Sequence, residues 1–270
     1  MTDHATNDLP LAAEFPAATR EQWRKLVDGV LKGASFDKRL VARTYDGLAI
    51  EPLYGRDAQA QPVMSRRPGT SWEIMQRVDH PDPAAANAEA QHDLENGATG
   101  LSLIFASSVG AYGYGLAASE EAIARALEGV HLDAGIALEL DLSPQAKDVA
   151  AWLAALAKRR GIAPTATNIR FGFDPIGAMA LRGGSPLPWS GLAPMFSAMV
   201  SDLAAQGFRG PFAAADGRVI HNAAGSEAQE LAYVLSVAVA YLRALEAGGI
   251  GLDAARRMIY FRPVADAASC

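Results

Sequence analysis

Cysteine is almost absent: it occurs once in 270 residues, as Cys270. A single cysteine cannot form an internal disulfide, and it cannot build a metal cluster that needs several thiolates. No apolar run approaches the roughly 20 residues that a membrane-spanning helix needs. The first residues, Met1 to His4, lack the basic and apolar regions of a secretory signal. We therefore expect a soluble, cytoplasmic protein that does not contact a membrane.

A basic stripe is also missing. The formal net charge is −6, from 24 Lys and Arg against 30 Asp and Glu, and the two signs are interspersed along the chain. This pattern gives nucleic acid no surface to bind, so we predict no nucleic-acid partner. Half of the residues are hydrophobic, which is enough to bury one substantial core.

The first 68 residues read as a tail followed by an arm. Residues 1–18 are rich in Ala, Pro and acidic groups and would pack little by themselves. Thr19 is a typical N-cap for a helix that ends at Gly33, and residues 45–54 form an extended run with a turn at its start. The helix would present an apolar stripe that we expect to be covered by a partner, formed by Trp23, Leu26 and Val30.

Residues 69–270 alternate between short apolar runs and helical patterns. This alternation predicts a parallel sheet of the α/β class with about six strands, because β/α crossovers of this length connect parallel strands. The periodicity alone leaves an open sheet and a barrel equally acceptable. The predicted strands are residues 70–78, 99–106, 136–140, 168–173, 212–215 and 258–261; the predicted helices are 84–96, 119–129, 143–160, 192–205, 226–248 and 252–257.

Polar residues follow several of these strands. Asp141, Asp174 and Asp216 each end a strand and could line one mouth of a barrel, although aspartate is also the residue that strand-ending turns prefer. We take Asp216, Arg218 and His221, in the predicted loop after the fifth strand, as candidate substrate-binding residues. His221 would donate a hydrogen bond to a substrate carbonyl; an ordinary loop histidine is the simpler interpretation.

No catalytic or metal-binding set stands out. The five histidines are scattered without a close pair, so the sequence predicts no metal site. The glycines at 110, 113 and 115 fit neither the dinucleotide fingerprint nor the P-loop, and we interpret them as loop flexibility. We assign no catalytic residue and no cofactor-binding residue.

Several segments together resemble one family. The run Tyr45–Tyr54 after a tryptophan-bearing helix, Trp72, Gly100–Leu103 and Glu230–Tyr233 are similar to methylmalonyl-CoA mutase subunits, most of all to the small, non-catalytic type. The resemblance covers about residues 20–262. It implies a triosephosphate-isomerase-type β/α barrel with eight strands, of which six are visible here, so we expect an apparently incomplete barrel behind an N-terminal helical and extended arm.

The resemblance also implies which functions the chain lacks. Catalytic subunits carry a histidine after the fifth strand, where this chain has Val219. They also carry a tyrosine and an arginine ahead of the tryptophan of the first strand, and the matching positions before Trp72 are Arg67 and Thr70. The family's cobalamin-binding motif D-x-H-x-x-G has no counterpart in the sequence. The family complex uses adenosylcobalamin to isomerise methylmalonyl-CoA and succinyl-CoA, and we expect this chain alone to be inactive and not to bind the cofactor tightly.

The resemblance implies a large mutase subunit as the partner, or a second copy of this chain, with acyl-CoA as a candidate ligand. Two alternatives remain open at this stage. One is an acyl-CoA mutase module that becomes active with a separate cobalamin-binding chain. The other is a stand-alone scaffold or binding protein without any link to cobalamin.

Overall fold

The computed structural model describes residues 14–16, 18–55, 57, 59–61, 69–143 and 148–265. The chain divides into two compact units, Met1–Pro68 and Gly69–Cys270, and each is described by itself. The predicted tail at residues 1–13, Arg67 and Cys270 lie outside the described residues.

The first unit consists of two helices and a small hairpin. Thr19 caps the first helix as predicted: its Oγ1 accepts from the Gln22 backbone N–H at 3.2 Å, while the Gln22 side chain accepts from the Thr19 N–H at 2.9 Å. The hairpin strands pair antiparallel across the turn predicted at Asp46–Gly47. The elements are α1 (Arg20–Leu31), α2 (Phe36–Leu40), β1 (Ala42–Arg43) and β2 (Ala49–Ile50).

The apolar stripe of α1 is only partly covered. Trp23 packs edge-on against Phe36 with ring centroids 6.0 Å apart, and the Arg24 guanidinium lies over the same ring. By contrast, Leu26 and Val30 are 73% and 79% exposed. Two of the three stripe residues are therefore available for contact with another surface.

The second unit is built on parallel strands, as predicted. A four-stranded sheet has the order β3-β4-β5-β6, and β7 pairs with β8. A single parallel bridge between Phe173 and Ala213 joins the two sheets. The described residues contain no closed barrel. The strands are β3 (Met75–Val78), β4 (Gly100–Ile104), β5 (Ala137–Asp141), β6 (Asn168–Arg170), β7 (Ala213–Asp216) and β8 (Ile259–Arg262).

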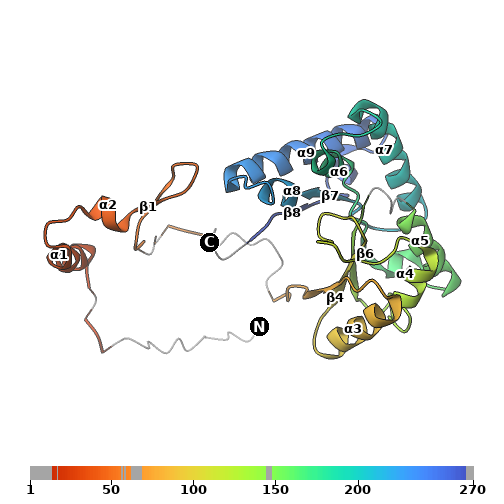
Figure 1. Cartoon of the computed structure of the whole chain (residues 1–270), viewed down its shortest axis with the longest axis horizontal. Helices are drawn as coiled ribbons and strands as arrows, with labels where there is room; N and C mark the ends of the chain where they lie inside the picture. The colour runs from red at the N-terminus through yellow and green to blue at the C-terminus, as the bar shows by residue number, and fades with distance from the viewer. Residues whose placement is uncertain are drawn as a thin grey trace, which may run out of the picture. The chain divides into compact units, whose positions relative to one another are not determined.

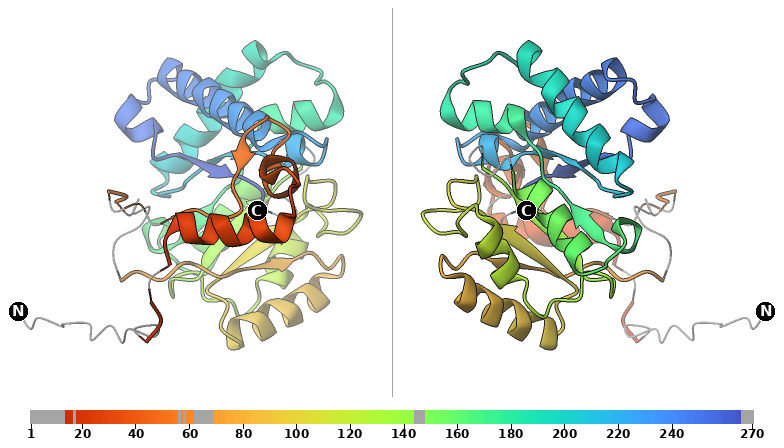
Figure 2. Two further views of the ribbon diagram at one scale, coloured as in Figure 1. Left: turned by 90° about the vertical axis from the view of Figure 1, so that its left-hand side faces the viewer. Right: turned by 90° about the vertical axis from the view of Figure 1, so that its right-hand side faces the viewer.

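Helices follow the strands and lie together on the outer side of the sheet, in front of the strands in the right-hand view of Figure 2. Figure 1 shows α9 over the β7–β8 pair, and α7 packs against α9. The helices are α3 (Pro83–Glu95), α4 (Glu120–Ala126), α5 (Val149–Arg159), α6 (Pro175–Arg182), α7 (Trp189–Ala205), α8 (Arg218–His221), α9 (Glu227–Ala247) and α10 (Leu252–Ala255), with a short 3-10 turn at Pro164–Ala166.

Three local predictions differ from the structure. Asp174 does not simply turn the chain out of a strand, because its side chain accepts from the Gly177 N–H and caps the unpredicted helix α6. The predicted loop after β7 contains the short helix α8. The fifth helix begins at Val149 behind Asp148 rather than at Ser143; residues 144–147, where its start was predicted, lie outside the described residues.

The core lies between the sheet and its helices. Alternate strand residues point to this side, and the buried side chains include Leu101, Leu103, Leu138, Leu140, Ile169 and Phe171. Phe171 stacks on Phe173 and Phe212, with ring centroids 6.1 and 5.4 Å apart. The opposite, inner face of the same strands therefore receives the intervening residues, many of which are polar.

The long helix α9 corrects the sequence prediction on membrane spans. By length and composition alone its 21 residues could cross a membrane, with a mean hydropathy of 1.2 in the most apolar window. A core helix passes the same test, and 39% of that window is buried inside the structure. Val234, Val237, Tyr241 and Leu245 are the large apolar residues that α9 buries.

Candidate functional site

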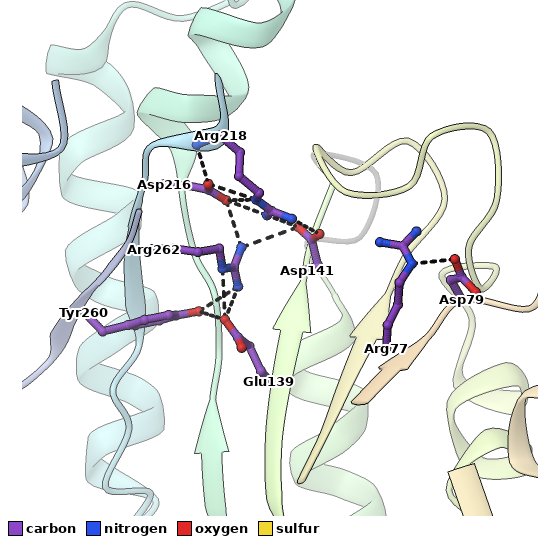
Figure 3. A network of polar contacts seen from close by, with 8 residues as sticks. All are labelled: Arg77, Asp79, Glu139, Asp141, Asp216, Arg218, Tyr260 and Arg262. Atoms are coloured by element: carbon purple, nitrogen blue, oxygen red, sulfur yellow. Dashed lines mark hydrogen bonds and ion pairs between the residues drawn. The ribbon is translucent and has the colours of Figure 1, made fainter. Parts of the chain in front are cut away.

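Polar side chains gather on the inner face at the carboxyl ends of the strands (Figure 3). In β5, Leu138 and Leu140 face the core, so Glu139 and Asp141 face the opposite side. Strands β7 and β8 contribute Asp216, Tyr260 and Arg262, and α8 contributes Arg218. In β/α folds this end of the sheet is where ligand sites are built.

Arg218 connects two strand ends. Its Nη1 and Nη2 donate to the two oxygens of Asp141 at 2.8 and 2.9 Å, and its Nε donates to both oxygens of Asp216 at 3.0 Å. The Asp141 and Asp216 side chains are only 4% and 3% exposed, against 18% for Arg218. The guanidinium is thus held by two buried carboxylates, each in a two-point contact.

Arg262 extends this network to a third carboxylate. Its Nη1 donates to Asp216 at 2.8 Å and its Nε to Glu139 at 3.0 Å, where a second ion pair joins Nη2 to the same Glu139 oxygen. The Tyr260 hydroxyl donates to Glu139 at 3.0 Å. We call these six residues the inner-face network: Glu139, Asp141, Asp216, Arg218, Tyr260 and Arg262.

The surroundings of Asp216 and Arg218 in the inner-face network favour the charged form of each side chain. Burial acts to raise the pKa of Asp216, but the Arg218 hydrogen bonds and the nearby Arg262 charge outweigh it, so the pKa lies below the ordinary value. Burial acts to lower the pKa of Arg218, and its bonds to Asp216 and Asp141 reverse that effect. Asp216 is therefore ionised at neutral pH and bound to arginine. A carboxylate in this state is unsuitable as a general acid or base.

The structure brings together two of the three predicted site residues. Asp216 and Arg218 bond directly to each other. His221, on the same short helix, instead lies with its Nδ1 3.7 Å from Oε2 of Glu230. Glu230 is buried and its Oε1 accepts from the Val264 N–H at 2.7 Å. His221 thus belongs to the contact between α8 and α9 rather than to the inner-face network.

Sequence reasoning missed Glu139, Tyr260 and Arg262. Each occupies an alternate position of a strand whose other residues are apolar or face the core. A charged residue inside such a strand predicts a polar inner face, so the alternation in Leu138–Asp141 was the signal that could have identified Glu139. Arg262 also lay one residue beyond the predicted sixth strand, which β8 includes.

The glycine-rich loop after β4 has a structural purpose that the prediction of simple flexibility missed. A Cβ at Gly110 would lie 2.3 Å from the Asp141 carboxylate and 2.5 Å from the Arg218 guanidinium. Glycine at this position lets the loop backbone pack directly on the inner-face network. Nearby, Arg77 pairs with Asp79 at 2.6 Å and lies against the Tyr112 ring (Figure 3 draws the ion pair).

Asp174 lies outside the inner-face network. Its Oδ1 accepts from the Gly177 N–H at 2.8 Å and from the buried Tyr241 hydroxyl. Burial raises the pKa of Asp174 to about 6, and the hydrogen bond from Tyr241 offsets only part of that rise. This carboxyl group therefore changes protonation close to physiological pH.

The raised pKa predicts a pH effect on stability. The folded chain binds the Asp174 proton more tightly than the unfolded chain, so the stabilisation is complete below the ordinary pKa of 3.8 and is lost as pH rises through about 6. Asp174→Asn removes this titration. We expect the free energy of unfolding of the unsubstituted chain, relative to Asp174→Asn, to fall by about 2 kcal/mol between pH 4 and pH 7.

Urea unfolding of both chains across this pH range measures the difference. Asp202→Asn, on the exposed part of α7, provides the control and should follow the unsubstituted chain. Parallel pH curves for Asp174→Asn and the unsubstituted chain would contradict the raised pKa.

The described residues contain no group of three or more His, Cys, Asp or Glu that could hold a metal ion. The three carboxylates of the inner-face network are paired with two arginines instead. What the arrangement can do is hold the ends of three strands in a fixed geometry.

The profile of the methylmalonyl-CoA mutase family matches residues 43–267. This chain belongs to the methylmalonyl-CoA mutase family. The match includes every strand of the second unit and therefore the inner-face network as well. The resemblance inferred from the sequence is confirmed.

Three characterised relatives are methylmalonyl-CoA mutase small subunits. That of Streptomyces virginiae is 34% identical over 99% of this chain and 44% of its own length. That of Propionibacterium freudenreichii is 27% identical over 98% of this chain and 43% of its own length. That of Porphyromonas gingivalis is 27% identical over 66% of this chain and 30% of its own length. This methylmalonyl-CoA mutase family chain thus spans less than half the length of these relatives.

Proposed function

We propose that this chain is the small-subunit-type, non-catalytic part of a cytoplasmic methylmalonyl-CoA mutase complex. The complex would use adenosylcobalamin to interconvert methylmalonyl-CoA and succinyl-CoA. The chain would contribute structure and partner contacts, while another chain would supply the groups that act on the substrate. The names of the three relatives support the assignment to the small subunit.

The observation that carries this proposal is that the protein's own acceptors engage Arg218 and Arg262 on the inner face. Stabilising a substrate oxyanion requires donors that point at the reacting group and are not already engaged. Here all three nitrogens of Arg218 donate to Asp141 and Asp216, and all three nitrogens of Arg262 have acceptors in the network. The guanidinium groups of Arg218 and Arg262 are thus engaged by the protein's own carboxylates.

Val219 supports the same proposal. It takes the place at which the resemblance puts a catalytic imidazole, and its side chain is 8% exposed in α8. Valine cannot donate a hydrogen bond, and losing one such donor typically reduces catalysis by about 2.7–4 kcal/mol. The Val219 side chain is packed in the protein interior instead.

The residues present do not fit adenosylcobalamin. The family's D-x-H-x-x-G motif has no counterpart in the sequence, and the Nδ1 of His80 already accepts from the Asp82 N–H at 3.0 Å. We therefore derive no step through the cofactor and propose that the rest of the complex holds it.

We further propose that the six parallel strands form part of a triosephosphate-isomerase-type barrel. Their sequential order and the repeat of strand and helix support it. Residues 1–68 would serve as an interface arm, because Leu26 and Val30 of α1 are exposed apolar side chains. The partner we propose for this arm is the large mutase subunit.

An activity assay tests the proposal. Purified chain mixed with adenosylcobalamin and methylmalonyl-CoA should form no succinyl-CoA above the blank, and the visible spectrum of the cofactor should not change. Co-expression with a methylmalonyl-CoA mutase large subunit should yield a complex that Leu26→Asp with Val30→Asp weakens. Arg39→Asp, an exposed change elsewhere in the same unit, is the matched control.

The outcomes separate the alternatives. Turnover by the chain alone would overturn the non-catalytic assignment. Heat from titrating methylmalonyl-CoA into the isolated chain, together with turnover once a separate cobalamin-binding chain is added, would favour the acyl-CoA mutase module. Failure to form any complex would favour a stand-alone binding protein.

A further inference from the structure

Arg77, in β3 beside the inner-face network, uses only one side of its guanidinium within the protein. Its Nε pairs with Asp79 at 2.6 Å. Its terminal nitrogens, Nη1 and Nη2, have no acceptor among the described residues, and the side chain is 40% exposed. In Figure 3 these two nitrogens point away from Asp79. Both NH₂ groups of Arg77 therefore remain available to a ligand that arrives from solvent.

Arg218 shows what the open side of such a guanidinium accepts. Its Nε donates to Asp216, while its Nη1 and Nη2 donate to the two oxygens of Asp141 at 2.8 and 2.9 Å. Arg77 makes the first of these contacts, from Nε to Asp79, without the second. The planar fork of Nη1 and Nη2 matches the two oxygens of a carboxylate. The open side of Arg77 thus fits a carboxylate that the described residues do not supply.

An aromatic ring lies beside this guanidinium. The centroid of the Tyr112 ring is 5.9 Å from Cζ of Arg77, and Tyr112 is 69% exposed. Its backbone is in the left-handed region, with φ of 47°, which a residue with a Cβ adopts only where its surroundings fix it. The loop is also tied to the end of β3, because the Gly115 N–H donates to the carbonyl oxygen of Asp79 at 2.8 Å. Ring and guanidinium are therefore held in place before a ligand binds, which lowers the cost of binding.

The nearest carboxylate of the inner-face network does not oppose an anion at Arg77. Gly110 lies between the two groups: a Cβ there would be 3.5 Å from Nη1 of Arg77 and 2.3 Å from Oδ2 of Asp141. Asp141 is bound by Arg218 at 2.8 Å and lies 3.6 Å from Nη1 of Arg262. An anion at Arg77 would thus face a carboxylate that two arginines already pair.

We propose that Arg77 and Tyr112 form a binding site for a small aromatic carboxylate. The carboxylate accepts from Nη1 and Nη2 of Arg77, and the flat body of the ligand lies against the Tyr112 ring. A charge-assisted contact at two points fixes the orientation of the ligand as well as its affinity. The inference goes beyond the proposed function, because it concerns binding without a reaction and Arg77 is none of the six residues of the inner-face network.

NMR of the tyrosine rings in the 270-residue chain, with benzoate as the probe at pH 7.5, tests the proposal. We expect a saturable shift of the Tyr112 ring signals with a Kd of about 1–10 mM, while the signals of the buried Tyr241 stay in place. Benzamide has the same ring without the charge and should bind at least about tenfold more weakly. Acetate has the charge without the ring and should bind at least about threefold more weakly.

Substitutions at Arg77 separate its charge from its shape. Arg77→Gln should weaken benzoate binding at least about tenfold, and Arg77→Lys, which keeps the charge without the planar fork, at least about threefold. Arg125→Gln is the matched control, because Arg125 is likewise a partly exposed arginine paired with one carboxylate, that of Glu128. It should leave the Kd unchanged. Unchanged Tyr241 signals show that each variant is still folded.

Three results would overturn the proposal. The first is the absence of a saturable shift of the Tyr112 signals with benzoate. The second is binding of benzamide or acetate as tight as that of benzoate. The third is a loss of binding in Arg125→Gln that equals the loss in Arg77→Gln.

Discussion

Arg262→Met should lower the free energy of unfolding by about 3–5 kcal/mol, the usual cost of removing one partner of a buried ion pair. The side chains of Arg262 and Glu139 are only 17% and 15% exposed. Without Arg262, the Tyr260 hydroxyl is the one hydrogen-bond partner that Glu139 keeps among the described residues. Asp216 would still be bound by Arg218, so most of the loss falls on Glu139.

Urea unfolding at pH 7.5 measures this effect. Arg243→Met, at an exposed position of α9, is the matched control and should change stability by about 0.5 kcal/mol or less. Adding Glu139→Gln to Arg262→Met removes the uncompensated charge and should recover part of the loss. A cost below about 1 kcal/mol for Arg262→Met would show that water, not Arg262, solvates Glu139.

Gly172→Ala should be the second severe change. Gly172 follows β6 with φ of 65°, and a Cβ there would lie 1.9 Å from the carbonyl oxygen of Leu140 in the neighbouring β5. Because this neighbour is backbone, it cannot rotate away. The left-handed conformation costs about 1–2 kcal/mol for a residue with a Cβ, and the clash with β5 adds about 1–3 kcal/mol or more.

Gly161→Ala separates the two contributions. Gly161 has nearly the same φ, 69°, but no atom lies within 4 Å of the Cβ position. Gly161→Ala should therefore lower the free energy of unfolding only by the cost of the left-handed conformation. Thermal or urea unfolding of the two variants should place Gly172→Ala at least about 1 kcal/mol below Gly161→Ala; equal stability would mean that β5 and the segment after β6 separate easily.

Local chemistry made much of the fold predictable from sequence. A capping box of Ser226 and Gln229 starts α9 where the sequence predicts a helix from residue 226, and the six predicted strands are present and parallel. Such signals depend on residues within one turn or one strand of each other. Asp174–Pro175 shows their limit, because the same pair suits a turn and a helix start, and packing against Tyr241 favours the helix.

The inner-face network was less predictable for a physical reason. Its bonds join residues far apart in the sequence: Asp141 and Arg218 are 77 residues apart, and Glu139 and Arg262 are 123 apart. Only the register of β5 with its neighbours and the meeting of strand ends bring them together. The aspartates at strand ends were noticed, but their arginine partners could not be assigned without the fold.

The sequential order of the strands affects how this protein folds. Each of β4, β5 and β6 pairs with the strand made just before it, and β8 pairs with β7. Each pairing joins strands that are one β/α unit apart, so these contacts are closer in sequence than pairings across the whole chain would be. On the ribosome, a newly made strand therefore finds its hydrogen-bonding neighbour already synthesised, and the sheet can grow one β/α unit at a time during translation.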